Sequence, residues 1–138
     1  MTSPVLYARE QTIAVAEFRT VLAESGMDAI RPVEDEARLA AMLAGANLIV
    51  TARRAEDGKL IGISRSITDF SWVCYLAELA VSAEAQKLGI GQGLLAEMRR
   101  ILGSGVSIVL QSVPEAVGFY QRAGMKPASD TFIYRRKQ

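Results

Sequence analysis

The stretch AVSAEAQKLGIGQGLL (residues 80–95) leads from an apolar run into a helical pattern through a loop with three glycines, Gly89, Gly91 and Gly93. Without side chains there, backbone N–H groups can come close to a bound anion, and a helix that begins in the loop adds the positive end of its dipole. The loop is therefore a candidate phosphate-binding site, with Lys87 as a nearby positive charge. The structural alternative is that the glycines allow a sharp strand-to-helix turn and close packing of the helix.

Two well-known phosphate-binding motifs do not fit this loop. A Walker loop has a Lys and then a Ser or Thr directly after its last glycine, but Leu94 follows Gly93 here. A dinucleotide-binding turn has its glycines at the end of a strand and an acidic residue about 20 positions later. In this chain roughly seven residues separate Val81 from the first glycine, and the next strand ends at Gln111 and Ser112. A nucleotide-binding structural domain is therefore disfavoured.

Length and composition limit the remaining functions. The 138 residues suit one compact domain that spans residues 1–138, and 50% of them are hydrophobic, as in ordinary globular proteins. The formal net charge is +1 without a long run of either sign, which disfavours nucleic-acid binding. Charged residues and glycines interrupt the apolar stretches, and the N-terminal segment turns charged early, so we expect neither a membrane span nor a secretory signal. We therefore expect a cytoplasmic protein.

The chain has no histidine and one cysteine, Cys74. This removes the usual general base and the commonest metal ligand, so Ser–His, Cys–His and His–metal chemistry is excluded and we expect no bound metal. Cys74 cannot form a disulfide within the chain. Because no histidine can activate it, we interpret it as a core residue rather than as an acyl-carrying nucleophile.

Hydrophobic periodicity predicts strands and helices around the glycine loop. On a central strand at residues 72–81, we expect Tyr75, Ala77, Leu79 and Val81 to face one way and Leu76, Glu78 and Ala80 the other. A helix from Gly91 to Gly103 and a strand at residues 106–112 complete a strand-helix-strand unit with parallel strands. The other predicted elements are an extended start at 5–10, helices at 12–25 and from Pro32 to Gly45, strands at 47–54 and 60–68 joined by a turn at Asp57 and Gly58, a short helix at 114–123 and a last strand at 131–137.

The sequence QKLGIG (residues 86–91) matches the acyl-CoA motif Q/R-x-x-G-x-G/A of the Gcn5-related N-acetyltransferase (GNAT) family, which the chain resembles. Upstream, YLAELAVSAEAQ (residues 75–86) is similar to the family's fourth strand and its connection to the pyrophosphate loop. Downstream, VGFYQRAGM (residues 117–125) is similar to the family's late tyrosine segment. The resemblance implies an α/β (α+β) fold, with a mixed, mostly antiparallel central sheet flanked by helices, in the order β-α-α-β-β-β-α-β-α-β and splayed after the fourth strand.

The resemblance also implies where acetyl-CoA binds as the co-substrate. Main-chain groups at the end of the central strand would hold the pantetheine and the acyl carbonyl, and backbone amides of the glycine loop would bind the pyrophosphate. The residues concerned are Leu79, Ala80, Val81, Gln86, Lys87, Leu88, Gly89, Ile90, Gly91 and Gln92. The chain departs from the family pattern at two positions, because Gln86 replaces a more frequent arginine and Val113 replaces an asparagine that many relatives carry.

Acetyl transfer from a thioester to an amine needs a free amine, a polarised carbonyl and a proton for the departing thiolate. Tyr120 matches the family's late tyrosine and is the candidate general acid, since a phenol stays protonated at neutral pH. The alternative is that Tyr120 is a core residue next to Phe119. Glu78 on the central strand is the candidate general base. Its alternatives are a carboxylate that binds the substrate ammonium, or one that pairs with an arginine such as Arg65.

The resulting hypothesis is an acetyl-CoA-dependent N-acetyltransferase that transfers an acetyl group to a primary amine of a small molecule or peptide, by direct transfer in a ternary complex. The alternative is a non-catalytic acyl-CoA-binding or regulatory module with the same fold. The resemblance implies that the acceptor contacts loops that include Met27, Asp28 and Arg31 and, separately, Phe70 and Trp72. The sequence leaves open whether the protein forms a homodimer through its last strands.

Overall fold

The computed structural model describes residues 4–137. Its strands are β1 (Val5–Glu10), β2 (Leu48–Arg54), β3 (Leu60–Thr68), β4 (Val73–Val81) and β5 (Ser107–Leu110). Its α-helices are α1 (Val15–Ser25), α2 (Glu36–Gly45), α3 (Ile90–Leu102) and α4 (Val117–Arg122), with short 3-10 helices η1 (Met27–Ala29), η2 (Ala83–Leu88) and η3 (Pro114–Ala116). The predicted order of strands and α-helices is confirmed from β1 to α4.

The five strands form one sheet in the order β1-β2-β3-β4-β5. Neighbouring strands from β1 to β4 are antiparallel, whereas β4 and β5 are parallel because α3 connects them across one face of the sheet. The predicted mixed sheet and its parallel strand-helix-strand unit are thus confirmed. The β4–β5 register runs from Val73 opposite Ser107 to Leu76 opposite Leu110.

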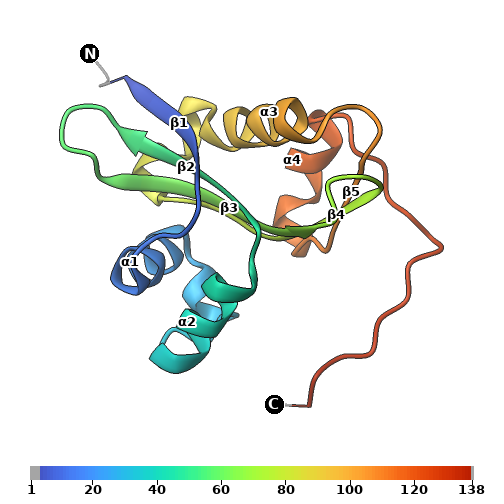
Figure 1. The fold of residues 1–138 in the computed structure, drawn as a ribbon, viewed down its shortest axis with the longest axis horizontal. Coiled ribbons are helices and arrows are strands. Elements are labelled where there is room, and N and C mark those ends of the chain that lie inside the picture. Colours follow the sequence, from blue (N-terminus) through green and yellow to red (C-terminus); the bar gives the residue numbers. More distant parts are fainter. Residues whose placement is uncertain (1–3, 138) are drawn as a thin grey trace.

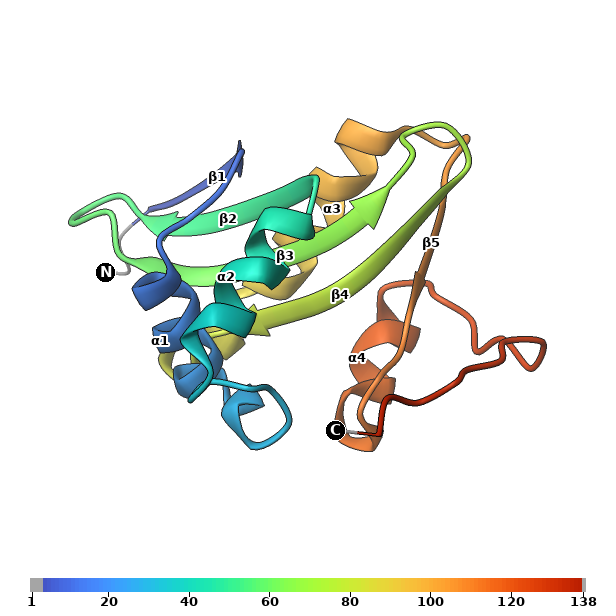
Figure 2. The same cartoon turned by 60° about the horizontal axis from the view of Figure 1, so that its bottom comes forward.

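Helices cover both faces of the sheet, with α1 and α2 on one side and α3 and α4 on the other (Figure 1, Figure 2). The core beneath α1 and α2 includes the fully buried Phe18 and Leu22. The core beneath α3 includes Leu94 and Met98, together with the buried thiol of Cys74 on β4. In the part of the chain that the structure describes, no helix is both long and apolar enough to cross a membrane.

The second helix begins later than its sequence pattern predicts. We expected a start near Pro32, but α2 begins at Glu36, after Asp35. The Asp35 carboxylate accepts a hydrogen bond from the Arg38 backbone N–H at 3.0 Å. Aspartate is a strong N-cap because it satisfies one of the free N–H groups of the first turn. Residues 30–35 therefore form a connection outside both helices.

A β-bulge interrupts the regular alternation of β4. The β3–β4 register places Arg65 opposite Glu78 and shifts by one residue there, which leaves Ala77 as the extra residue. The uniform alternation that we expected along β4 is therefore wrong beyond Leu76. Leu79 packs in the same core cluster as Leu76, beneath α3, while the Glu78 side chain contacts groups on the α1 and α2 side.

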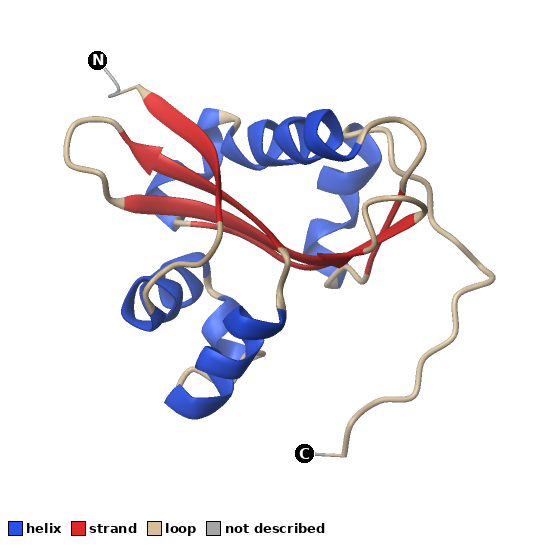
Figure 3. Cartoon of the chain, in the orientation of Figure 1, coloured by secondary structure: helices blue, strands red, loops and turns tan. Residues whose placement is uncertain are grey.

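The predicted last strand at residues 131–137 is wrong. After Gly124 the chain forms no helix or strand as far as residue 137 (Figure 3). Phe132 is 93% exposed and the Tyr134 side chain is fully exposed. The aromatic and β-branched residues of this segment favour a strand, but a strand is stable only when it pairs with a neighbour. The described sheet ends at β5, and residues 131–137 do not pair with it.

Candidate active site

The sheet opens between β4 and β5. Their pairing ends at Leu76 and Leu110, while β4 continues to Val81. Within the described chain, residues 77–81 therefore have no strand partner on the edge that faces away from β3. Figure 2 shows β5 and α4 diverging from this half of β4. The predicted splay after the fourth strand is confirmed, and it leaves backbone groups of β4 open on one edge.

The glycine loop follows β4 and ends at the start of α3. After η2, Gly89 has a φ of 75°, a conformation that glycine adopts without strain. The first hydrogen bond into α3 runs from the Gly93 N–H to the Gly89 carbonyl at 3.0 Å. The N–H groups of Ile90, Gly91 and Gln92 come before it and have no acceptor within the helix. They can bind an anion at the positive end of the helix dipole.

Gly91 and Gly93 also serve packing. A Cβ atom on Gly91 would lie 2.8 Å from Cζ of Phe119, and one on Gly93 would overlap the phenol of Tyr7. Both glycines therefore let α3 lie close to its neighbours, α4 and β1. Close packing of the helix, the structural alternative for the loop, therefore explains Gly91 and Gly93. Gly89 is explained by its positive φ, which other residues rarely adopt.

The other predicted acetyl-CoA residues lie around the same loop. Gln86 donates a hydrogen bond from Nε2 to the Val81 carbonyl at 3.0 Å, which ties the loop to the end of β4. Lys87 and Leu88 are exposed beside it. Ala80 is buried, and its side chain packs in the cluster beneath α1 and α2. The structure thus brings residues 79–92 together at one end of the sheet, with the Ala80 side chain turned to the opposite face.

Tyr120 lies in α4, across the opening from β4. Its ring packs edge-to-face on Phe119, with 5.1 Å between the ring centroids, and both rings pack against the core cluster beneath α3, as do Leu79 and Val81. Phe119 also lies directly over Gly91, which holds α4 next to the glycine loop. Burial raises the pKa of the Tyr120 phenol above its usual range. The structure therefore places a half-buried phenol in α4, packed against the same core cluster as Leu79 and Val81 of β4.

Glu78 lies on the other face of the sheet and is only 2% exposed. Arg65 donates to its two carboxylate oxygens, from Nε to Oε2 at 2.5 Å and from Nη2 to Oε1 at 2.9 Å. Arg31 adds a third bond, from Nε to Oε1 at 2.9 Å. Among the alternatives for Glu78, this geometry matches the carboxylate that pairs with an arginine. Guanidinium groups thus occupy three of the roughly four acceptor positions of this carboxylate.

A family model covers most of the chain, because residues 9–127 match the acetyltransferase (GNAT) domain. The chain belongs to the GNAT family. The match includes β4, the glycine loop and Tyr120, and it ends before residues 128–137. GNAT membership implies acetyl-CoA as the acetyl donor. No curated protein has a sequence that matches this GNAT chain.

Solved structures share the GNAT fold of this chain. A Deinococcus radiodurans R1 protein assigned as an acetyltransferase is 25% identical, with a TM-score of 0.74 over 98% of this chain and 94% of that one. A GNAT family acetyltransferase from Streptococcus pneumoniae TIGR4 is 16% identical, with a TM-score of 0.74 over 98% and 100% of the two chains. An aminoglycoside acetyltransferase from an uncultured soil sample, solved with sisomicin, is 17% identical, with a TM-score of 0.69 over 96% and 97%. The last two likenesses concern the fold alone.

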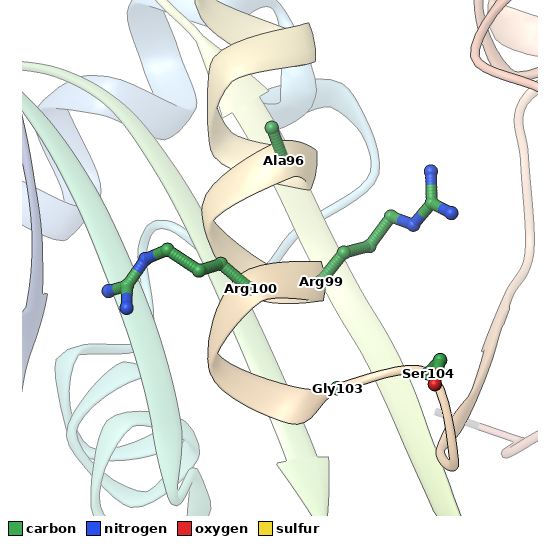
Figure 4. A pocket seen from close by; sticks show the side chains of 5 residues that line it. All are labelled: Ala96, Arg99, Arg100, Gly103 and Ser104. Carbon is green, nitrogen blue, oxygen red and sulfur yellow. The ribbon is translucent and has the colours of Figure 1, made fainter.

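Two surface hollows of the GNAT domain lie away from the glycine loop. One, of about 380 Å³, lies at the C-terminal end of α3 and includes Arg99 and Arg100, whose side chains point in opposite directions from the helix (Figure 4). The other, of about 770 Å³, lies between the end of β1 and the end of α2. Neither hollow includes Tyr120 or a residue of the glycine loop. Among residues 4–137, no three cysteine or acidic side chains group as metal ligands.

Two contacts that shape this GNAT site could not be foreseen from the sequence. Phe119 lies over Gly91, and Arg31 reaches β4 from the connection between α1 and α2. Arg31 was expected in an acceptor loop, but its bond to Glu78 was not. Both contacts join residues far apart in the chain, so no local pattern of hydrophobicity or charge indicates them.

Proposed function

We propose that this GNAT domain transfers an acetyl group from acetyl-CoA to a primary amine, by direct attack of the amine on the thioester in a ternary complex. One arrangement supports the proposal: β4 and β5 separate after Leu76 and Leu110, the first turn of α3 has free N–H groups, and the half-buried Tyr120 packs against the same core cluster as Leu79 and Val81 of β4. The N–H groups of residues 90–92 would hold the pyrophosphate. The edge of residues 77–81 that no strand pairs would offer the pantetheine and the acyl carbonyl those main-chain groups that Arg31 and Gln86 do not already bind.

Tyr120 is the proposed general acid. As the amine nitrogen bonds to the acyl carbon, the carbon–sulfur bond breaks and its electron pair stays on sulfur. The Tyr120 O–H donates a hydrogen bond to the sulfur and then its proton, and the phenolate recovers a proton from solvent. Because burial raises the pKa of this phenol, the proton is in place at neutral pH.

The amine is proposed to lose its own proton to solvent. Glu78 is bound by two guanidinium groups on the face of the sheet opposite Tyr120, so we give it a positioning role that ties Arg31 to β4. A general-base role would bring the amine to a carboxylate that already accepts three bonds from guanidinium groups. A primary amine with a pKa of about 10.4 is almost entirely protonated at neutral pH, so turnover should depend on the small free fraction.

The binding half of the proposal is tested with one matched pair of variants. Gln92→Pro removes one N–H group from the first turn of α3, where proline is tolerated, and Gln92→Ala keeps that group. We expect calorimetry to show acetyl-CoA binding to wild type and to Gln92→Ala, and about tenfold weaker binding to Gln92→Pro. ATP and NAD serve as control ligands. Equal affinity for the two variants would mean that the phosphates bind elsewhere.

The catalytic half is tested by release of free CoA from acetyl-CoA in the presence of a library of primary amines. An acetyltransferase releases CoA only when an acceptor is present, and mass spectrometry detects the acetylated amine. The alternative, a non-catalytic acyl-CoA-binding module, predicts tight acetyl-CoA binding without CoA release. Release of CoA without an acetylated amine would indicate hydrolysis and would contradict the proposal.

A further inference from the structure

Arg31 stands at the point where β4 loses its pairing with β5. It belongs to the connection between α1 and α2, and its Nη2 donates a hydrogen bond to the carbonyl of Ala77 at 2.9 Å. Ala77 is the bulged residue and the first residue of β4 beyond the pair formed by Leu76 and Leu110. The Arg31 guanidinium therefore lies beside the opening, on the face of the sheet opposite α3.

The charges around Arg31 do not balance. The guanidinium groups of Arg31 and Arg65 share the single carboxylate of Glu78, so two positive charges meet one negative charge. Arg65 is further compensated by the C-terminal end of α2, because its Nη1 donates to the carbonyl of Met42 at 3.0 Å. Arg31 lies at the end of the three-residue helix η1, where its Nη1 donates to the carbonyl of the C-cap Ile30 at 3.1 Å. Its other acceptors are the carbonyls of Ile30 and Ala77, which carry no net charge.

Within residues 4–137, Arg31 has N–H groups that no acceptor binds, and its side chain is partly exposed. A guanidinium has five N–H groups, and Arg31 uses three of them in its bonds to Glu78, Ala77 and Ile30. Its side chain is 21% exposed, whereas that of Arg65 is 8% exposed. The excess positive charge of the cluster is thus carried by the more accessible of the two arginines.

We infer that Arg31 binds an acidic group on the acceptor, so that the amine substrate of this domain also carries a carboxylate or a comparable anion. The inference rests on the proposed N-acetyltransferase function and adds the class of acceptor to it. A planar guanidinium recognises a carboxylate through paired N–H groups, and the fixed bonds to Glu78 and Ala77 hold it in one orientation. Arg31 is thereby a residue that selects the acceptor, while Glu78 positions Arg31.

The test uses pairs of acceptors that differ only in the acid. The probes are the common α-amino acids and their carboxamides, compared at equal concentration of free amine. The enzymes are wild type, Arg31→Gln, Arg31→Lys and the control Arg38→Gln, which removes an exposed arginine of α2. Arg31→Gln leaves Glu78 paired with Arg65, so the buried carboxylate keeps a partner and the fold should persist. Thermal unfolding of each variant checks this.

We expect wild type to favour the best acid over its carboxamide by at least about tenfold in kcat/KM, the size of one charge-assisted recognition contact. Arg31→Gln should remove this preference, because kcat/KM for the acid should fall at least about tenfold more than kcat/KM for the carboxamide, chiefly through a higher KM for the acid. Arg31→Lys should restore part of it, and Arg38→Gln should leave it unchanged. Equal turnover of acids and carboxamides by wild type, or an equal loss for both with Arg31→Gln, would overturn the inference.

A second measurement does not depend on turnover. The side-chain N–H resonances of arginine are followed by NMR in the CoA-bound protein while N-acetylated amino acids or their carboxamides are added. We expect the Arg31 Nε–H signal and the backbone amides near Ala77 to shift with the acids alone. Acetyl-CoA binding and amine acetylation without such shifts would overturn the inference and leave the proposed function standing. Absence of acetyl-CoA binding would remove the proposed function itself and, with it, the inference.

Discussion

At the scale of single residues, the hydroxyl group of Tyr120 can be removed to distinguish a catalytic role of this residue from a packing role. Tyr120→Phe keeps the ring that packs on Phe119 and removes only the O–H. We expect kcat to fall by about 10²-fold or more, the usual contribution of a general acid, with acetyl-CoA affinity and thermal stability nearly unchanged. Steady-state kinetics, calorimetry and a melting curve measure the three quantities. A kcat within twofold of wild type would assign Tyr120 to the core alone.

The pH profile tests the same residue in another way. An acid acts while it is protonated, so activity is present below the pKa of the phenol and is lost as the pH rises through it. Burial raises that pKa above the usual value of about 10, and we therefore expect no alkaline loss of kcat/KM below about pH 10. On the acidic side kcat/KM should rise with pH as the amine loses its proton. A fall that begins near pH 8 would identify a different acid.

At the scale of elements, the contact between α3 and α4 connects the glycine loop to Tyr120. In Gly91→Ala the new methyl group would lie 2.8 Å from Cζ of Phe119, so the ring and α4 must move. We expect a loss of about 1–3 kcal/mol of stability, the usual cost of overpacking, together with a lower kcat because Tyr120 follows Phe119 in the helix. Gly45→Ala is the matched control, because a Cβ there has no neighbour within 4 Å. Chemical denaturation and kinetics of both variants check the prediction.

An ion-pair network joins β1, α1 and β2. Arg53 bonds to Glu10 at 2.8 Å and to Glu17 at 2.6 Å, and these bonds lower the pKa of both carboxyls. A lowered folded pKa gives stability that is present above the unfolded value of about 4.3 and is lost as the pH falls through the folded value. The side chains are partly exposed, so we expect Arg53→Gln to lose only about 1 kcal/mol at pH 7. Urea unfolding at pH 7 and below pH 4 should show that the difference shrinks in acid. An unchanged difference would point to packing as its cause.

The sequence indicated the elements better than it indicated their local irregularities. Periodicity and the turn at Asp57 and Gly58 predicted the antiparallel strands and the parallel unit correctly, because these signals are local. The bulge at Ala77 was missed, since it depends on register with β3 and leaves the alternation of residue types intact. The helix α2 starts later than the pattern after Pro32 predicts, because the Asp35 side chain caps its first turn.

At the scale of the whole molecule, the C-terminal segment lies apart from the core. Truncation after Pro127 removes the exposed Phe132 and Tyr134 and none of the buried core residues. We expect the melting temperature to change by less than about 2 °C and acetyl-CoA affinity to stay the same, because a stability change of 1 kcal/mol would shift the melting point by several degrees. A larger drop would mean that the segment packs on the domain. Light scattering at rising protein concentration should show less self-association of the truncated protein, because two exposed aromatic rings are gone.

Only part of the candidate site could be predicted from the sequence, because its remaining contacts form only when distant parts of the chain come together in the fold. The loop at residues 86–92 could be found because its glycines are close together in the sequence. The pairing of Glu78 with two arginines could not be chosen from the sequence, where base, ammonium-binding and ion-paired roles fit equally well. Only the assembled sheet places Arg65 opposite Glu78 and brings Arg31 over Ala77. The last strand failed for a related reason, since strand propensity does not supply a neighbouring strand.

Cys74 gives the molecule a practical property. It is the only cysteine of the chain and is fully buried, and burial raises the pKa of its thiol. A chromogenic disulfide reagent reacts with thiolates that it can reach, so the folded protein should leave the reagent colourless. Every increment of colour in a reaction mixture would then count one released CoA, without subtraction of a protein background. In the absence of substrate, the slow reaction of the same reagent with Cys74 would report the opening of the core that exposes this thiol.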